Sequence, residues 1–176
     1  MDKRALKSKN AIIATFLALI KKDPGERITV KELCEKSHIN KSTFYAHYRD
    51  LRDLHEQLED QLIDQILSTL PRSGTYSIDQ PEQFASDLYQ ALIQYGPEMD
   101  LLFPGSSKAQ FGVKLEKAIR QVVGSKYPSF FSTPQADILL TYQIQGAFHT
   151  YLNYKDGDDV LIRTITDISK ALIKLY

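Results

Sequence analysis

Residues 28–54 read ITVKELCEKSHINKSTFYAHYRDLRDL, which is the spacing of two short helices, a tight turn between them and the start of a longer helix. Thr29, followed three residues later by Glu32, is a capping box that predicts the start of the first helix. Asn40 is a good N-cap for the second helix, and Asp50 caps the third. The second helix is dense in groups that bond phosphates and base edges, so this stretch predicts a helix-turn-helix that reads DNA.

Apolar residues elsewhere recur at helical spacing without strand alternation, which predicts an all-α fold of about nine helices. We expect these helices over residues 6–20, 30–37, 41–47, 51–70, 81–95, 98–103, 108–123, 134–154 and from 159 to the C-terminus. Gly124 is expected to end the helix over 108–123. Residues 1–50 would form the helix-turn-helix domain. Residues 51–176 would form a second helical domain, with a connecting helix over 51–70 and a linker over 71–80.

Charge is distributed unevenly in a chain of zero net charge. Residues 1–49 hold eleven Lys and Arg against five Asp and Glu, and the rest of the chain holds eleven against seventeen. The positive part contains the predicted reading helix, and a positive field attracts polyanions such as DNA. A solvated basic helix face would account for the charge equally well.

Several classes of protein are disfavoured by composition. The chain has no apolar run long enough to span a membrane, and its basic start lacks the features of a signal peptide, so a cytoplasmic location is expected. The single cysteine, Cys34, excludes an internal disulfide. No His or Cys cluster has metal-ligand spacing, and neither a metal nor a cofactor is expected.

The stretch over residues 24–54 resembles the DNA-binding domain of the TetR/AcrR family of bacterial transcriptional regulators. The matching features are Thr29, Leu33, residues 38–40, residues 43–45 and Tyr48. This sequence has His38 where the family has a turn glycine, and Leu51 where a lysine often begins the fourth helix. Residues 101–119 look like the compact C-terminal domain common among these regulators in low-GC Gram-positive bacteria, including relatives of dihydroxyacetone-operon regulators.

The resemblance and the local chemistry together imply a set of DNA-contacting residues. These candidates are Thr29, Lys31, Asn40, Lys41, Ser42, Thr43, Tyr45, His47, Arg49 and Arg52. Lys41, Ser42 and Thr43 lie in the first half of the reading helix, where they would meet base edges. We expect Phe44 to lie in the core. His47 would contact a phosphate or sugar, or it would be a surface histidine with no role in binding.

The second domain is rich in aromatic residues, since thirteen of the eighteen Phe and Tyr residues lie between Tyr76 and Tyr154. Regulators of this family commonly hold an inducer there, so the resemblance implies a small apolar or aromatic effector, with core packing as the alternative for each residue. The candidate ligand residues are Tyr89, Tyr95, Phe103, Phe111, Tyr142, Gln145, Phe148 and His149.

The last two predicted helices carry apolar stripes wider than one neighbouring helix would cover. This width predicts a homodimer with an isologous four-helix interface, unless the two helices are central in a monomer core. The candidate interface residues are Leu140, Ile144, Ala147, Tyr151, Leu161, Ile165, Ile168 and Leu172.

Together these features predict a sequence-specific transcriptional regulator of the TetR type, a ligand-responsive repressor that acts as a homodimer on a near-palindromic DNA operator. The alternatives are an activator, or a helix-turn-helix adaptor that binds another protein without a small-molecule inducer. An enzyme is the rival from another class. However, the sequence has no nucleophile elbow, glycine-rich phosphate loop or metal spacing, so no catalytic residue is expected.

Overall fold

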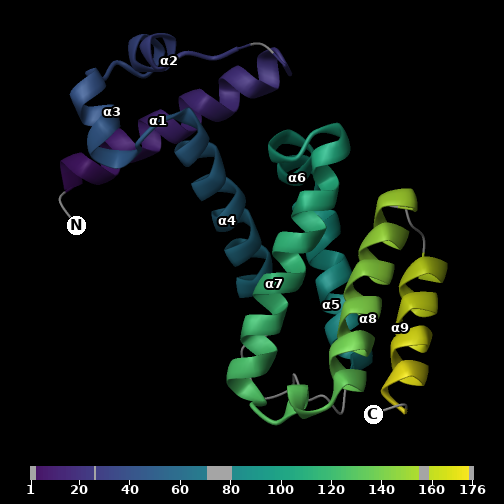
Figure 1. The fold of residues 1–176 in the computed structure, drawn as a ribbon. Coiled ribbons are helices and arrows are strands. Elements are labelled where there is room, and N and C mark those ends of the chain that lie inside the picture. The colour runs from purple at the N-terminus through teal and green to yellow at the C-terminus, as the bar shows by residue number, and fades with distance from the viewer. Residues whose placement is uncertain (1–2, 26, 71–80, 155–158, 175–176) are drawn as a thin grey trace. The chain divides into compact units, whose positions relative to one another are not determined.

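The computed structural model describes residues 3–25, 27–70, 81–154 and 159–174, which contain nine α-helices and no strand (Figure 1). The α-helices are α1 (Lys3–Lys22), α2 (Val30–Ser37), α3 (Lys41–His47), α4 (Leu51–Thr69), α5 (Pro81–Gln94), α6 (Gly96–Leu102), α7 (Lys108–Lys126), α8 (Pro134–Asn153) and α9 (Asp159–Ile173). Two 3₁₀ turns, η1 (Gly105–Ser107) and η2 (Phe130–Ser132), flank α7. The predicted all-α fold is confirmed, and the predicted linker over residues 71–80 lies outside the described residues.

Two compact units divide the chain, Met1–Glu59 and Asp60–Tyr176, and α4 contributes to both of them. In the N-terminal unit α1 contacts α2 and α3, which also contact each other. Helices of eight and seven residues are too short to persist alone in water, so α2 and α3 depend on this burial. The buried core of this unit includes Ile12, Phe16, Leu33, Cys34, Phe44, Tyr48, Leu54 and Leu58.

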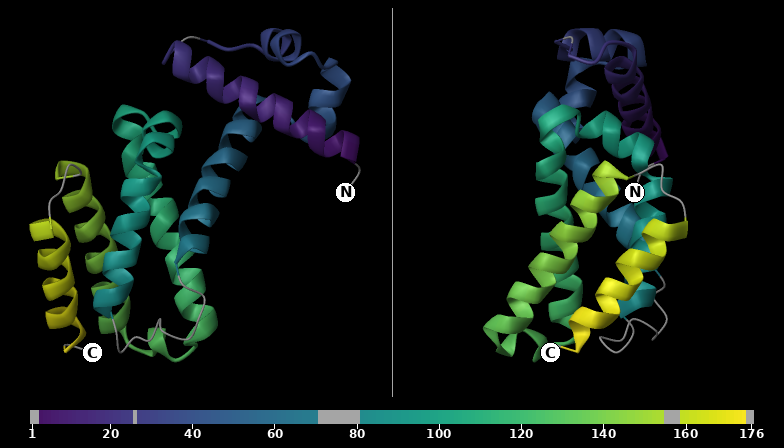
Figure 2. Two further views of the ribbon diagram at one scale, coloured as in Figure 1. Left: turned by 180° about the vertical axis from the view of Figure 1, so that it is seen from behind. Right: turned by 90° about the vertical axis from the view of Figure 1, so that its right-hand side faces the viewer.

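The C-terminal unit is a helical bundle in which α5 packs along α9 and also contacts α8, and α8 contacts α7 (Figure 2). Its interior is aromatic, with the rings of Phe103 and Phe111 at a centroid distance of 5.2 Å and those of Phe111 and Phe148 at 5.3 Å. Gly112 on α7 permits this packing, because a Cβ atom there would lie 2.8 Å from the Phe148 ring. The buried Tyr151 hydroxyl donates a hydrogen bond to the Leu92 carbonyl at 2.9 Å, which joins α8 to α5.

Most helix boundaries follow the predicted caps, but one expected end is wrong. Gly124 does not end α7, which continues to Lys126, and the Tyr127 N–H donates to the Val123 carbonyl at 2.7 Å. A glycine costs a helix about 1 kcal/mol without breaking it. The predicted cap of α8 is confirmed, because Thr133 Oγ1 accepts the Ala136 N–H at 3.4 Å.

Candidate nucleic-acid interface

The N-terminus of α2 is capped as the sequence predicts. Thr29 has extended backbone angles, and its Oγ1 accepts the Glu32 N–H at 3.2 Å. The Glu32 carboxylate is bound by the Lys36 ammonium at 2.7 Å, a hydrogen bond that lowers the pKa of this carboxyl. Lys31 is exposed in the first turn of α2 and lies 3.9 Å from a Glu35 oxygen. The first turn of α2 therefore presents an exposed cation beside the amides of a helix N-terminus.

The turn between α2 and α3 has a left-handed residue where the sequence places His38. The backbone of His38 lies at φ 56° and ψ 41°, and its N–H points back to the Cys34 and Glu35 carbonyls. The Ile39 N–H also donates to the Cys34 carbonyl, at 3.0 Å. These bonds satisfy the last carbonyls of α2 and fix the angle at which α3 leaves it.

The short helix α3 has one buried side and one open side. Phe44 is fully buried, whereas Lys41, Ser42 and Ala46 are exposed and Tyr45 has 56% of its surface exposed. Polar side chains that can reach base edges and phosphates therefore project from the side opposite the core. Asn40 occupies the N-cap position of α3 with an extended backbone, as expected. However, the expected capping hydrogen bond from its side chain is absent, and the residue is exposed.

His47, the last residue of α3, is held by α1. Its Nε2 atom lies 2.8 Å from the Ser8 hydroxyl, and the imidazole is half-buried. Sequence reasoning missed Ser8, although it lies one turn before the buried Ile12 and so on the inner side of α1. The Ser8 contact ties the C-terminal end of α3 to the first half of α1.

The start of α4 is fixed by two aspartates. Asp50 accepts the Asp53 N–H at 2.8 Å, and Asp53 in turn accepts the Arg49 N–H at 2.8 Å. This backbone hydrogen bond, together with the Arg49 guanidinium 3.2 Å away, lowers the pKa of Asp53. The Arg49 and Arg52 side chains remain 83% and 85% exposed, so both guanidinium groups can meet a phosphate.

Eight of the ten sequence-predicted DNA residues are exposed in the N-terminal unit, and Thr43 and His47 are half-buried. The eight exposed residues are Thr29, Lys31, Asn40, Lys41, Ser42, Tyr45, Arg49 and Arg52. They come from three successive features of one small unit: the start of α2, the open side of α3 and the start of α4. The arrangement suits a reading helix flanked by phosphate-binding groups.

The predicted effector residues fall into different environments in the C-terminal unit. Tyr89, Phe103, Phe111 and Phe148 are buried, Tyr95 and Gln145 are half-buried, and Tyr142 and His149 are exposed. The buried rings contact one another, as do those of Tyr89 and Tyr151. The aromatic candidates thus form part of the packed interior, and Tyr142 and His149 lie on the outer side of α8.

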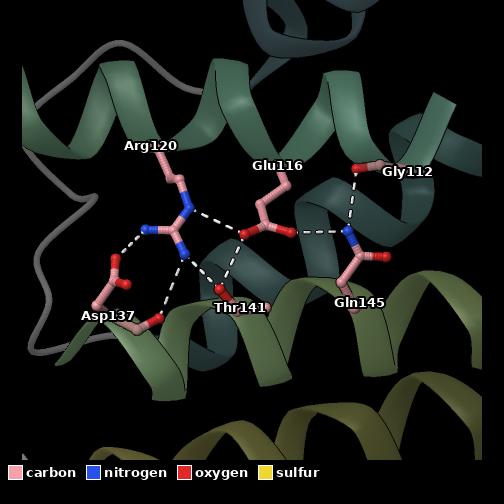
Figure 3. A network of polar contacts seen from close by, with 6 residues as sticks. All are labelled: Gly112, Glu116, Arg120, Asp137, Thr141 and Gln145. Carbon is pink, nitrogen blue, oxygen red and sulfur yellow. Dashed lines mark hydrogen bonds and ion pairs between the residues drawn. The ribbon is translucent and has the colours of Figure 1, made fainter. Parts of the chain in front are cut away.

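A polar network joins α7 to α8 beside these rings, and sequence reasoning missed it (Figure 3). Arg120 binds Glu116 at 2.9 Å and also contacts Asp137 and Thr141. Thr141 donates to Glu116 at 2.9 Å, and Gln145 donates to it at 2.7 Å. Burial alone would raise the pKa of Glu116, but these hydrogen bonds outweigh burial and lower it.

The predicted interface residues of α8 and α9 lie mostly within the chain's own core. Leu140, Ile144, Tyr151 and Ile165 are each at most 7% exposed, and Ala147, Leu161 and Leu172 are half-buried. Of this set only Ile168 is exposed, at 50%. The outer sides of the two helices carry other large apolar residues, namely Ile138, Tyr142 and Val160, each about two-thirds exposed.

Two other kinds of site are absent from the described ranges. There, no group of three or more His, Cys, Asp or Glu residues is arranged to hold a metal ion. None of the helices described has the length and apolar content of a membrane span.

Fold and surface together define an all-α protein with an N-terminal helix-turn-helix module. The structure is similar to that of a TetR family transcription regulator from Marinobacter aquaeolei VT8, with a TM-score of 0.52, 17% sequence identity and 98% of each chain covered. The chain therefore has the all-α fold of TetR regulators. No protein-family model matches the chain, and no curated protein matches it.

Proposed function

We propose that this protein is a sequence-specific DNA-binding transcriptional regulator that reads DNA with α3. The observation that carries the proposal is the open side of α3. Lys41, Ser42 and Tyr45 are exposed there, whereas Phe44 of the same helix is buried in the core. An α-helix fits the major groove of B-DNA, and short polar side chains near its N-terminus distinguish base pairs there. The basic excess of residues 1–49 and the fold shared with a transcription regulator support this function.

The direct test is to select genomic DNA fragments with the purified full-length protein and to measure their affinity. The double variant K41A/Y45A should lose selective binding, because both side chains lie on the open side of α3. The matched control is K117A/V122A, which removes an exposed lysine and an exposed apolar side chain from α7, outside α3, α8 and α9, and should bind as the wild type does. If K41A/Y45A lost its affinity for DNA but kept its biological activity, the function would be that of a protein-binding adaptor. If it kept its affinity for the selected DNA, α3 would not be the reading helix.

The proposal includes a homodimer built on the outer sides of α8 and α9. Five of the ten exposed large apolar residues of the described chain lie on or directly after these helices, among them Tyr142 at 65% and Ile168 at 50% exposure. A second copy that covers this surface would present two reading helices to successive major grooves, about 34–36 Å or somewhat more apart. This interface lies on the predicted helices but mainly on side chains outside the predicted set.

Oligomeric state tests this part of the proposal. The variant Y142E/I168E places two carboxylates on the surface and should sediment as a monomer. V122E is the control, because Val122 on α7 is 52% exposed and lies outside α8 and α9. A dimer that survives Y142E/I168E would require a different interface.

Ligand-responsive repression is the last part of the proposal. The aromatic rings between α7 and α8 are packed together, so a small apolar or aromatic effector would bind among them, beside the amide of Gln145, only in an arrangement in which the two helices move apart. The Lys114 ammonium on α7 lies 2.6 Å from a carboxylate oxygen of Asp60 on α4, so a shift of α7 would reach the helix shared by both units. An effector that binds one arrangement better than the other would change DNA affinity by that difference.

Repression is proposed from the family resemblance and is tested in cells. A reporter gene placed behind the selected DNA should be expressed more strongly when the regulator is removed. Small aromatic compounds that release the purified protein from this DNA should raise the same reporter. Lower reporter expression after removal would identify an activator instead.

A further inference from the structure

The first two turns of α1 concentrate positive charge. Lys3, Arg4 and Lys7 occupy three of the first five positions of this helix, and its first turn contains no acidic residue. Lys3 and Lys7 are four residues apart and both exposed, so their ammonium groups lie on the same side of the helix and repel each other. The partial positive charge of the helix N-terminus adds to this repulsion. Charges that destabilise the helix on which they lie are typical of a functional surface.

A hydrogen bond between α1 and α3 places this basic segment beside the proposed reading helix. The Ser8 hydroxyl lies 2.8 Å from Nε2 of His47, the last residue of α3, although the two residues are 39 positions apart in sequence. Ser8 directly follows Lys7, and Arg4 lies one turn before it on the same side of α1. Within the N-terminal unit, the first turns of α1 pass beside α3 in both views (Figure 1, Figure 2).

The dimensions of DNA indicate what this segment would meet. The major groove is about 12 Å wide, and an α-helix with its side chains is about 10–12 Å across. A reading helix therefore fills the groove, and a second helix packed beside it lies over the sugar-phosphate backbone. Lysine side chains placed over the backbone bind phosphates as point charges, and such phosphate contacts carry no base-sequence information.

We propose that Lys3 and Lys7, together with Arg4, form a second phosphate-contact surface beside α3, held there by the hydrogen bond between Ser8 and His47. This inference rests on the proposed DNA-binding function and adds residues outside the predicted set. The surface contributes sequence-independent, salt-dependent affinity. His47 binds Ser8 at the junction of the two helices, so its imidazole positions α1 rather than contacting DNA.

The full-length variant K3Q/K7Q tests this surface. Binding to the selected DNA and to unrelated DNA of equal length is measured between about 50 and 200 mM salt, where each lost phosphate contact reduces the log–log slope by about 0.9. We expect a slope shallower by about 2 per protomer on both DNAs, because two contacts are lost, with the sequence preference unchanged. The control K117Q/K126Q removes two exposed lysines from α7 and should keep the wild-type slope.

The outcomes separate this inference from the proposed function. If the wild type binds DNA and K3Q/K7Q keeps its slope, the second surface is refuted and the reading helix stands. If the wild type shows no salt-dependent binding, both proposals fail.

A measurement on the unmodified chain guards against a variant that folds poorly. Amine acylation followed by mass spectrometry should show Lys3 and Lys7 protected in the DNA complex, and Lys117 equally reactive with and without DNA. Equal reactivity of Lys3 and Lys7 in both states would overturn the inference.

Discussion

Replacement of Gly112 by alanine tests how α7 and α8 are held together. A Cβ atom at this position would lie 2.8 and 2.9 Å from two ring carbons of Phe148, and 3.3 Å from the side-chain oxygen of Gln145. Phe148 is 1% exposed and its ring also packs against Phe111, so the ring cannot move aside without disturbing the core. Overpacking costs about 1–3 kcal/mol, and the better helix propensity of alanine offsets about 1 kcal/mol. We expect G112A to lower the free energy of unfolding by up to about 2 kcal/mol.

Gly124, on the same helix, offers a matched control for this substitution. A Cβ atom there would lie 3.5 Å from the nearest Phe131 ring carbon, which is an ordinary contact. G124A should therefore keep the wild-type stability or gain up to about 1 kcal/mol. Urea unfolding followed by circular dichroism measures both variants. The packing argument is refuted if G112A proves as stable as G124A.

Two further sites, His38 and Tyr48, give predictions about stability. His38→Gly should raise the stability of the helix-turn-helix by about 0.5–1 kcal/mol. The left-handed backbone costs a non-glycine residue about 1–2 kcal/mol, and the extra freedom of glycine in the unfolded chain cancels part of the gain. An unchanged or lower melting temperature would contradict this prediction. The Tyr48 hydroxyl is buried with no hydrogen-bond partner among the described residues, so Tyr48→Phe should be neutral or stabilising. The comparison variant Tyr151→Phe loses a hydrogen bond to Leu92 and should cost about 1–2 kcal/mol; equal losses in the two variants would refute the distinction. Burial raises the pKa of Tyr48 to about 12 from 10.0, so between these two values the folded chain keeps a proton that the unfolded chain releases. The wild type should therefore lose stability as the pH rises from 10 to 12. The variant Tyr48→Phe should lose less stability over the same pH range.

Local signals explain why so much of the fold was predictable from the sequence. Thr29, Asp50 and Thr133 each form the capping hydrogen bond that their side chains favour, because a cap depends only on residues within one turn. The left-handed turn at His38, in contrast, was indicated by the family resemblance, since the family has a turn glycine at this position. Gly124 was misjudged because the end of α7 depends on the packing around it rather than on helix propensity alone.

The sites were predictable to different extents. The candidate DNA residues come from one continuous stretch, so their helical register indicated which of them face outward. The network of Arg120, Glu116 and Thr141 joins two helices, and the Ser8 contact with His47 joins α1 to α3, so neither follows from local spacing. On α8, the width of the apolar stripe did not indicate which side packs inward, and Tyr142 lies outward.

The proposed function requires above all that α3 and its flanks read DNA. The measurement that tests this is the affinity of the full-length protein for its selected DNA as a function of salt concentration. A dimer that neutralises about six to eight phosphates should show a log–log slope of roughly −5 to −7. A slope near zero on the same DNA would contradict the account.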